Sequence, residues 1–199
     1  MKKLVAAIAL CASLAASAES DGYFMMSVLN PAQLPTQAST IYGVRLSAIY
    51  GECFKIYGVD AGLSGYITER MLGVQAGGLN FVGLDQAGVQ IGALGNWVNG
   101  DSYGLQVGIY NAVNGRAHGL YVSGLSIMEE VYGAQFGVYQ YSKYSGGAQI
   151  GLVNTSRTAD GVQIGLVNWS ESLRGVQIGL WNIIEDAPWP QMPFVNWCF

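Results

Sequence analysis

Short stretches in which apolar residues alternate with small or polar ones recur along most of the chain. In the clearest stretch, aliphatic side chains stand at the second, fourth and sixth places and Gly or Gln stands between them, as in Gly161-Val-Gln-Ile-Gly-Leu-Val-Asn168. A period of two is typical of a β-strand, whose successive side chains point to opposite faces. The pattern therefore predicts that each stretch is one strand followed by a turn.

These stretches form an internal repeat of ten copies, each 14 to 16 residues long. The third position is Gln in seven copies and the fifth is Gly in eight. We expect Gly and Gln to lie on the face opposite the aliphatic residues, with Gly151, Gly165 and Gly179 in crowded surroundings there. The copies begin at Gly43, Gly58, Gly73, Gly88, Gly104, Gly119, Gly133, Gly147, Gly161 and Gly175.

Two turns between repeats favour an antiparallel arrangement. Asn99-Gly100 and Asn114-Gly115 bracket the alternating segment Asp101 to Val113, and Asn-Gly between strand residues is a strong hairpin signal. Further strand-like segments, Tyr23 to Leu29 and Met192 to Phe199, flank the repeats. The sequence thus predicts an all-β protein, an up-and-down antiparallel β-barrel of about ten to twelve strands closed by pairing of its end strands.

The same repeats also fit a parallel β-solenoid with coils of 14 to 15 residues. In that fold identical residues stack into ladders, and the Gln positions would form one column. Arg45 and Asp60 occupy the Gln position in consecutive copies, so a solenoid would stack them as an ion pair. We weigh the hairpin turns above the ladders and keep the solenoid as the alternative. A second column would be formed by Asn80, Asn111, Asn154, Asn168 and Asn182.

The beginning of the chain has the pattern of a signal peptide. Residues 1–18 contain Lys2 and Lys3, an apolar run and a small-residue ending, which leaves residues 19–199 as a single β-repeat domain. Without the two lysines the domain has seven basic and 13 acidic residues, a formal charge of −6. This balance argues against nucleic acid as a partner. Cys53 and Cys198 remain, either as a disulfide or as two free thiols.

Residues suited to chemistry are sparse. His118 is the single histidine of the sequence, and the two cysteines lack the paired spacing of a zinc site. His118 is expected to be a satisfied or solvent-facing side chain, and the adjacent acids Glu129-Glu130 and Glu185-Asp186 to be solvated turn charges. The sequence therefore predicts no enzymatic activity, no catalytic, cofactor-binding or metal-binding residue, and no cofactor.

The order of the motifs resembles a bacterial surface-repeat family first named from Leptospira. The resemblance rests on Tyr42-Gly-Val-Arg-Leu-Ser-Ala-Ile-Tyr-Gly51, on Tyr57-Gly-Val-Asp-Ala-Gly-Leu63, on the Gly-Val-Gln-Ile-Gly-Leu-Val-Asn copies and on a Pro-rich aromatic ending. It covers nearly all of residues 23–199. What it implies is a location in the bacterial envelope or at the cell surface.

Together these patterns predict a non-enzymatic outer-membrane or cell-surface protein with a structural or pore-like role and membrane lipid as its partner. The aliphatic positions would face lipid and Gly, Ser and Gln the interior, while Tyr42, Tyr57, Tyr103 and Tyr132 are candidates for an aromatic girdle. The alternative is a soluble periplasmic or surface-exposed module for binding or adhesion, with the aliphatic stripe as its core. Protein or glycan partners, the oligomeric state and the openness of any lumen stay undecided.

Overall fold

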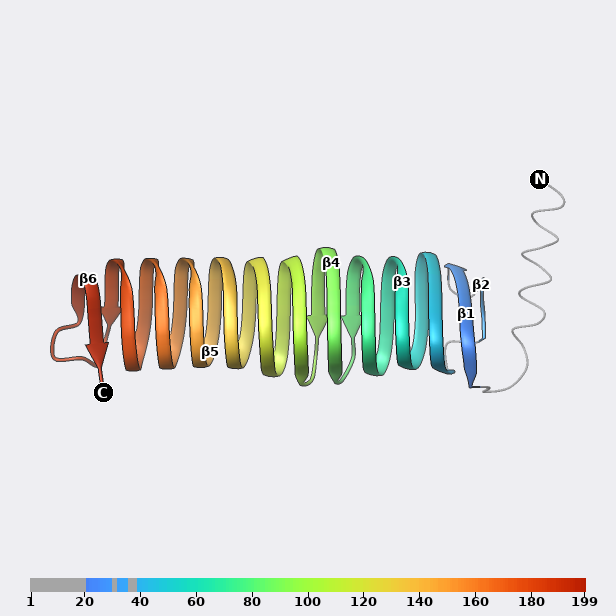
Figure 1. Cartoon of the computed structure of the whole chain (residues 1–199), viewed down its shortest axis with the longest axis horizontal. Coiled ribbons are helices and arrows are strands. Elements are labelled where there is room, and N and C mark those ends of the chain that lie inside the picture. The colour runs from blue at the N-terminus through green and yellow to red at the C-terminus, as the bar shows by residue number, and fades with distance from the viewer. Residues whose placement is uncertain (1–20, 30–31, 36–38) are drawn as a thin grey trace.

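The computed structural model describes residues 21–29, 32–35 and 39–199, and these residues form a parallel β-solenoid without a helix (Figure 1). The predicted signal peptide, residues 1–18, lies outside this described part. Two of the strands, β3 and β5, run without interruption through several coils. The strands are β1 (Gly22–Leu29), β2 (Ala32–Leu34), β3 (Thr40–Val82), β4 (Gln86–Val98), β5 (Ser102–Ile184) and β6 (Gln191–Cys198).

Successive repeats lie in parallel register, each directly on the one before. Gly73 of β3 pairs with Gly88 of β4, which pairs with Gly104 of β5. The repeat that begins at Gly88 holds one extra residue, and the register shift that absorbs it lies between Gly92 and Gly95. Each repeat is therefore one coil of the solenoid rather than one strand of a meander, as the alternative prediction has it.

Separate strands cover the two ends of the stack. β1 adds a parallel strand to the first coil, with Ser27 opposite Ser47, and β2 folds back antiparallel on β1. At the far end β6 pairs antiparallel with the last coil, with Trp197 opposite Val176. In Figure 1 β1 and β6 lie at opposite ends of the molecule. Such caps shield the ladder groups that the terminal coils would otherwise leave open to other chains.

The predicted antiparallel barrel is wrong. The strands at the two ends of the chain exist, but they never meet to close a barrel, and neighbouring repeats run parallel. Gln163 would face an internal lumen in a barrel, yet it is 1% exposed and lies in a packed interior. The assignment of faces does hold, since Ile164 beside it is 39% exposed and points outward.

The Asn-Gly pairs misled the prediction because they are corners of coils. A type I′ hairpin turn needs positive φ at both central residues. Among the described residues Phe194 is the one non-glycine with positive φ, and the positive-φ glycines do not include Gly100 or Gly115. A side chain at Gly115 would instead meet the carbonyl oxygen of Gly100 at 2.5 Å. These glycines therefore allow two coils to approach at a corner.

A ladder of glutamine amides runs along the interior. Gln90 donates from Nε2 to Oε1 of Gln75 at 2.8 Å, and Gln163 donates in the same way to Gln149 at 2.7 Å. All these amides donate toward the N-terminal end of the stack. The remaining links of this kind are Gln106 to Gln90, Gln149 to Gln135 and Gln177 to Gln163.

A second ladder, made of asparagines, donates in the opposite direction. Asn80 donates to Oδ1 of Asn96 at 2.8 Å and also to the backbone carbonyl of Ile91 at 3.0 Å. Asn154 and Asn168 repeat this arrangement near the C-terminal end. Because the two ladders donate in opposite directions, their amide dipoles partly cancel along the solenoid axis.

Apolar side chains fill the rest of the interior in the N-terminal coils. Ile67, Val82, Val98, Val113 and Met128 are buried in one cluster there. In the C-terminal coils serines replace them, and Ser156 accepts a hydrogen bond from Gln163 at 3.0 Å. The core is thus largely polar, while most aliphatic residues of the repeats lie outside.

The leading glycines form a column in which backbones of consecutive coils touch. All ten have a φ between 126 and 151°, where residues with a side chain are strained. A Cβ at Gly147 would lie 2.1 Å from the carbonyl oxygen of Gly133. The inner glycines are crowded as expected, since a Cβ at Gly165 would lie 2.6 Å from Asn154 Nδ2.

Gly147→Ala should therefore lower the stability of the solenoid, by about 1–3 kcal/mol from backbone strain alone and further through the overlap with Gly133. The neighbouring Gly146→Ala is the matched control, because the nearest atom there belongs to the movable Tyr144 ring at 2.9 Å. The measurement is thermal unfolding followed by circular dichroism. Equal unfolding temperatures for the two variants would contradict this account of the glycine column.

Candidate functional site

One outer surface of the solenoid is aliphatic and carries no charge. We define this aliphatic face as positions two, four, six and seven of the ten repeats, counted from the leading glycine. None of these positions holds Asp, Glu, Lys, Arg or His. Their side chains are largely solvent-exposed, for example 62% for Ile109, 48% for Leu166 and 60% for Leu180.

The aliphatic face is large for an exposed apolar surface. Ten coils at the ordinary strand spacing of about 4.8 Å, each presenting about six residues of about 3.3 Å, give roughly 1,000 Å². The largest apolar patch on a typical monomer is about 300–600 Å² and often functional. The end strands extend the face further, because Phe24 and Met26 of β1 pair with Val44 and Leu46. A surface of this extent points to a contact rather than to chance exposure.

A row of aromatic side chains borders the aliphatic face, because the residue just before the leading glycine is aromatic in five of the ten repeats. Tyr42 and Tyr57 stack with ring centroids 5.2 Å apart. Farther along, His118 lies stacked between Tyr103 at 4.9 Å and Tyr132 at 4.8 Å. The four tyrosines singled out in the sequence thus belong to this row, and His118 is a ring within it.

A second aromatic row lies at the other border of the aliphatic face, where the residue that follows the aliphatic positions is aromatic in five repeats. Trp97 contacts the ring of Tyr110 on the aliphatic face at 6.1 Å, while its indole N–H donates to Asn99 at 2.8 Å. Trp169 likewise donates to Glu185 at 3.1 Å. Their rings therefore border the apolar surface and their polar groups point away from it. The other members of the row are Tyr66, Phe81 and Tyr141.

Most exposed charged side chains of the coils lie beyond these rows, and several pair from one coil to the next. Asp160 and Arg174 are exceptions, since they occupy the row position before Gly161 and Gly175. Arg116 contacts Asp101 at 2.6 Å, and its side-chain hydrogen bond lowers the pKa of that carboxyl group. Further exposed pairs of this kind are Lys55–Glu69, Arg70–Asp85, Lys143–Glu129 and Arg157–Glu171. Exposed pairs contribute little stability each, but their placement makes the outer surface of every coil amphipathic.

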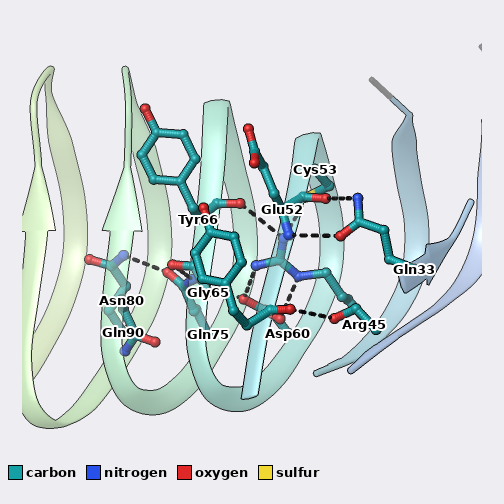
Figure 2. A network of polar contacts seen from close by, with 12 residues as sticks. Gln33, Arg45, Glu52, Cys53, Asp60, Gly65, Tyr66, Gln75, Asn80 and Gln90 are labelled. Atoms are coloured by element: carbon teal, nitrogen blue, oxygen red, sulfur yellow. Dashed lines mark hydrogen bonds and ion pairs between the residues drawn. The ribbon is translucent and has the colours of Figure 1, made fainter. Parts of the chain in front are cut away.

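A buried ionic cluster ends the glutamine ladder in the first coils (Figure 2). Arg45 donates from Nε to Asp60 Oδ1 at 2.7 Å and from Nη2 to Oδ2 at 2.5 Å. Its Nη1 donates to the carbonyl oxygen of Tyr66 and to Cys53 Sγ, both at 3.0 Å. Gln75 then donates to Asp60 at 2.9 Å and joins the pair to the ladder. This is the ion pair that the solenoid alternative predicts.

Burial decides how the groups of this cluster titrate. Burial alone lowers the pKa of Arg45, but the hydrogen bond and the charge of Asp60 outweigh it and raise that pKa above its ordinary value. Burial raises the pKa of Cys53 to about 11, although the nearby Arg45 opposes this. Arg45 is therefore a fixed cation paired with Asp60, and Cys53 is a neutral thiol at physiological pH.

The described residues hold no group of three or more His, Cys, Asp or Glu that would bind a metal ion. In the part of the chain that the structure describes, no helix has the length and apolar character needed to cross a bilayer.

The adjacent acids Glu129 and Glu130 both have partners on the polar outer surface. Glu130 accepts a hydrogen bond from the Tyr132 hydroxyl at 3.2 Å, and Glu129 pairs with Lys143. Sequence patterns located the aliphatic positions and one aromatic row, but missed the second row.

The two cysteines lie at opposite ends of the stack, which excludes the disulfide left open by the sequence. Cys53 belongs to the first repeat, whereas Cys198 belongs to β6, and both are free thiols. Cys198 packs against a small buried cluster that includes Leu173 and Ile184.

Comparison of the chain with protein-family models, with curated proteins and with solved structures finds no match.

Removing the acidic partner of the buried pair should be costly. Asp60→Asn leaves the Arg45 cation without its counter-charge and should lower stability by about 3–5 kcal/mol. Urea unfolding, followed by circular dichroism, measures the change. The double variant Arg45→Gln, Asp60→Gln places the ordinary ladder residue at both sites and should recover most of the loss. A double variant as unstable as Asp60→Asn would show that the ladder does not extend through these coils.

The two thiols should differ in reactivity. In a chain beginning at Glu19, an exchange assay at pH 8 should modify half-buried Cys198 readily and Cys53 at least about a hundredfold more slowly, because the thiolate is the reactive form.

The raised pKa of Cys53 also makes stability depend on pH, because between pH 9 and pH 11 the folded chain keeps the Cys53 proton while the unfolded chain loses it. Stability from this group is therefore complete below pH 9 and declines toward pH 11. Cys53→Ala should flatten that decline, and rapid modification of both thiols would contradict the burial.

Proposed function

We propose that this protein is a non-enzymatic component of the bacterial cell envelope that binds flat on a membrane through its aliphatic face. The observation that carries the proposal is the aliphatic face itself, which is uncharged over ten coils and has five aromatic side chains along each of its two borders. Tyr and Trp favour the interface between lipid and water because their rings are apolar and their polar groups remain hydrated.

The arrangement has the same logic as an amphipathic helix that lies in the plane of a membrane. In this chain the apolar surface is a sheet face, the aromatic rows mark its two borders, and the paired charges lie on the outer surface beyond them. The Trp97 and Trp169 indoles support the orientation, because each N–H donates to a group on the polar side. The proposal contains no pore, since amide ladders occupy the interior.

Sequence features support the location. The predicted signal peptide at residues 1–18 favours export, and the resemblance of the repeats to the bacterial surface-repeat family favours the outer membrane or the cell surface. Without residues 1–18 the chain has a formal charge of −6. A negative protein is repelled by anionic lipid, so the apolar contact must supply the attraction. Vesicles of zwitterionic phosphatidylcholine are therefore the preferred binding surface.

Flotation of the chain beginning at Glu19 with phosphatidylcholine vesicles tests the proposal. The variant Val122→Lys, Ile164→Lys places two lysines on the aliphatic face in coils that do not touch. It should weaken binding about tenfold, or about 1.4 kcal/mol, since lysine in the apolar part of a membrane costs up to ~4 kcal/mol and much less near its edge.

The matched control adds the same charge to the opposite side. Thr68→Lys, Ser172→Lys lies on the polar surface and should float like the unmodified chain. Two outcomes contradict the proposal: an unmodified chain that stays with the aqueous fraction, or two variants that float equally, whether both bind or both lose binding. A chain that remains a stable monomer in water without lipid would favour the soluble binding module instead.

A further inference from the structure

An apolar cavity of about 670 Å³ opens at the N-terminal end of the aliphatic face. Its walls come from β1, β2 and the first two coils, and no charged side chain lines it. Sites of this size ordinarily hold small apolar molecules. The outward-facing residues that line it are Met26, Val28, Leu34, Leu46, Ala48 and Ala61.

The backbone register explains why these residues meet. Met26 of β1 lies between Leu34 of β2 and Leu46 of the first coil, one row across the sheet. These three long side chains point outward, whereas the side chains of Ala48 and Ala61 are short. The aliphatic face is therefore hollowed at the two alanines, beside the three long side chains. Leu166 and Ile164 occupy the corresponding positions of a later repeat. The cavity is thus part of the aliphatic face, at a place where two alanines stand instead of the larger aliphatic side chains of later repeats.

The wall of the cavity is held in place by the inward-facing neighbours of its lining residues. Ser27 donates to the carbonyl oxygen of Tyr50 at 3.1 Å, which fastens β1 to the first coil. Gln33 of β2 donates to the carbonyl oxygen of Glu52 at 2.9 Å and accepts from the Glu52 N–H at 3.3 Å. A wall anchored by three hydrogen bonds supports a preformed site rather than a loose flap.

We propose that this cavity binds one acyl chain of a membrane lipid, an inference that rests on the proposed contact between the aliphatic face and the membrane. The lining carries no charge, and its polar side chains, those of Ser27, Gln33 and Ser47, are nearly buried on the inner side of the sheet. Hydrocarbon therefore gains most from entering. The cavity opens on the aliphatic face, where the tails of the bilayer would lie. A bound chain would replace the missing side-chain volume at Ala48 and Ala61 and anchor the N-terminal cap.

Photo-crosslinking in phosphatidylcholine vesicles tests the inference, with a diazirine group in one acyl chain of the lipid. Labelling should concentrate on Met26, Leu34 and Leu46, at several times the level of equivalent positions in later coils. Ala61→Phe fills the cavity and should reduce this labelling about tenfold. Ala76→Phe is the matched control, because Ala76 holds the same place in the next repeat, outside the cavity. Both variants should float and unfold as the unmodified chain does.

The outcomes separate the two proposals. If the chain floats but labelling is even along the face, or Ala61→Phe labels like the unmodified chain, the cavity inference fails and membrane binding stands. If the chain does not float, the proposed function fails, and labelling in water with a diazirine-bearing dodecanol then tests the cavity alone. Concentrated labelling of the same residues by that probe, abolished by Ala61→Phe, would keep the cavity as a site for a hydrocarbon chain. Even labelling would overturn it.

Discussion

Seven of the ten coils of this solenoid bury side-chain amides, and most of these amides find their partners on the coils above and below. An unpartnered buried amide costs free energy, so the Gln and Asn columns tolerate no slip between coils. The extra residue in the repeat that begins at Gly88 shows how strict this is. It is absorbed between Gly92 and Gly95, after Gln90 and before Asn96, so that both side chains still meet their counterparts. The extra residue thus lies between the two ladders, whereas the later coils are shortened after the Asn position, where Asn154 to Gly161 is one residue shorter than Asn111 to Gly119. In both cases the change in length leaves the register of the two ladders intact.

The same constraint explains the features that interrupt the ladders. Tyr121 occupies the Gln position of one repeat. Its hydroxyl donates to the carbonyl oxygen of Ser102 at 3.0 Å, so the buried hydroxyl has a hydrogen-bond partner although no amide of the ladder pairs with it. At the N-terminal end the ladder needs a final acceptor, and the Asp60 carboxylate supplies it to Gln75. A buried carboxylate needs a cation in turn, and Arg45 provides one with four donated hydrogen bonds. The ionic cluster is thus a consequence of ending an amide column inside a protein.

Much of the arrangement of side chains followed from the sequence, whereas the path of the chain did not. The period of two placed Ile164 outside and Gln163 inside correctly, because a barrel and a solenoid share that alternation. The decision between them rested on Asn99-Gly100 and Asn114-Gly115, which are local signals that say nothing about the strand beyond the turn. The near-constant period and the Arg45–Asp60 coincidence were long-range signals, and they indicated the parallel stack. The cavity could not have been predicted, because it depends on β2 turning back beside β1, which no repeat encodes.

A polar core has a consequence for the outer surface. In most domains aliphatic residues stabilise the fold by leaving water. Here, in the part of each coil that forms the aliphatic face, the inward positions are taken mostly by amides, glycines and serines, so the aliphatic residues between them must face outward. These aliphatic side chains become buried only when the protein contacts another apolar phase. Because every coil contributes an equivalent strip, the free energy of that contact should grow with the number of coils rather than depend on a few residues. A contact spread so evenly matches a surface that is itself uniform, as a membrane is, better than a partner protein, whose binding energy is ordinarily concentrated in a few hot-spot residues.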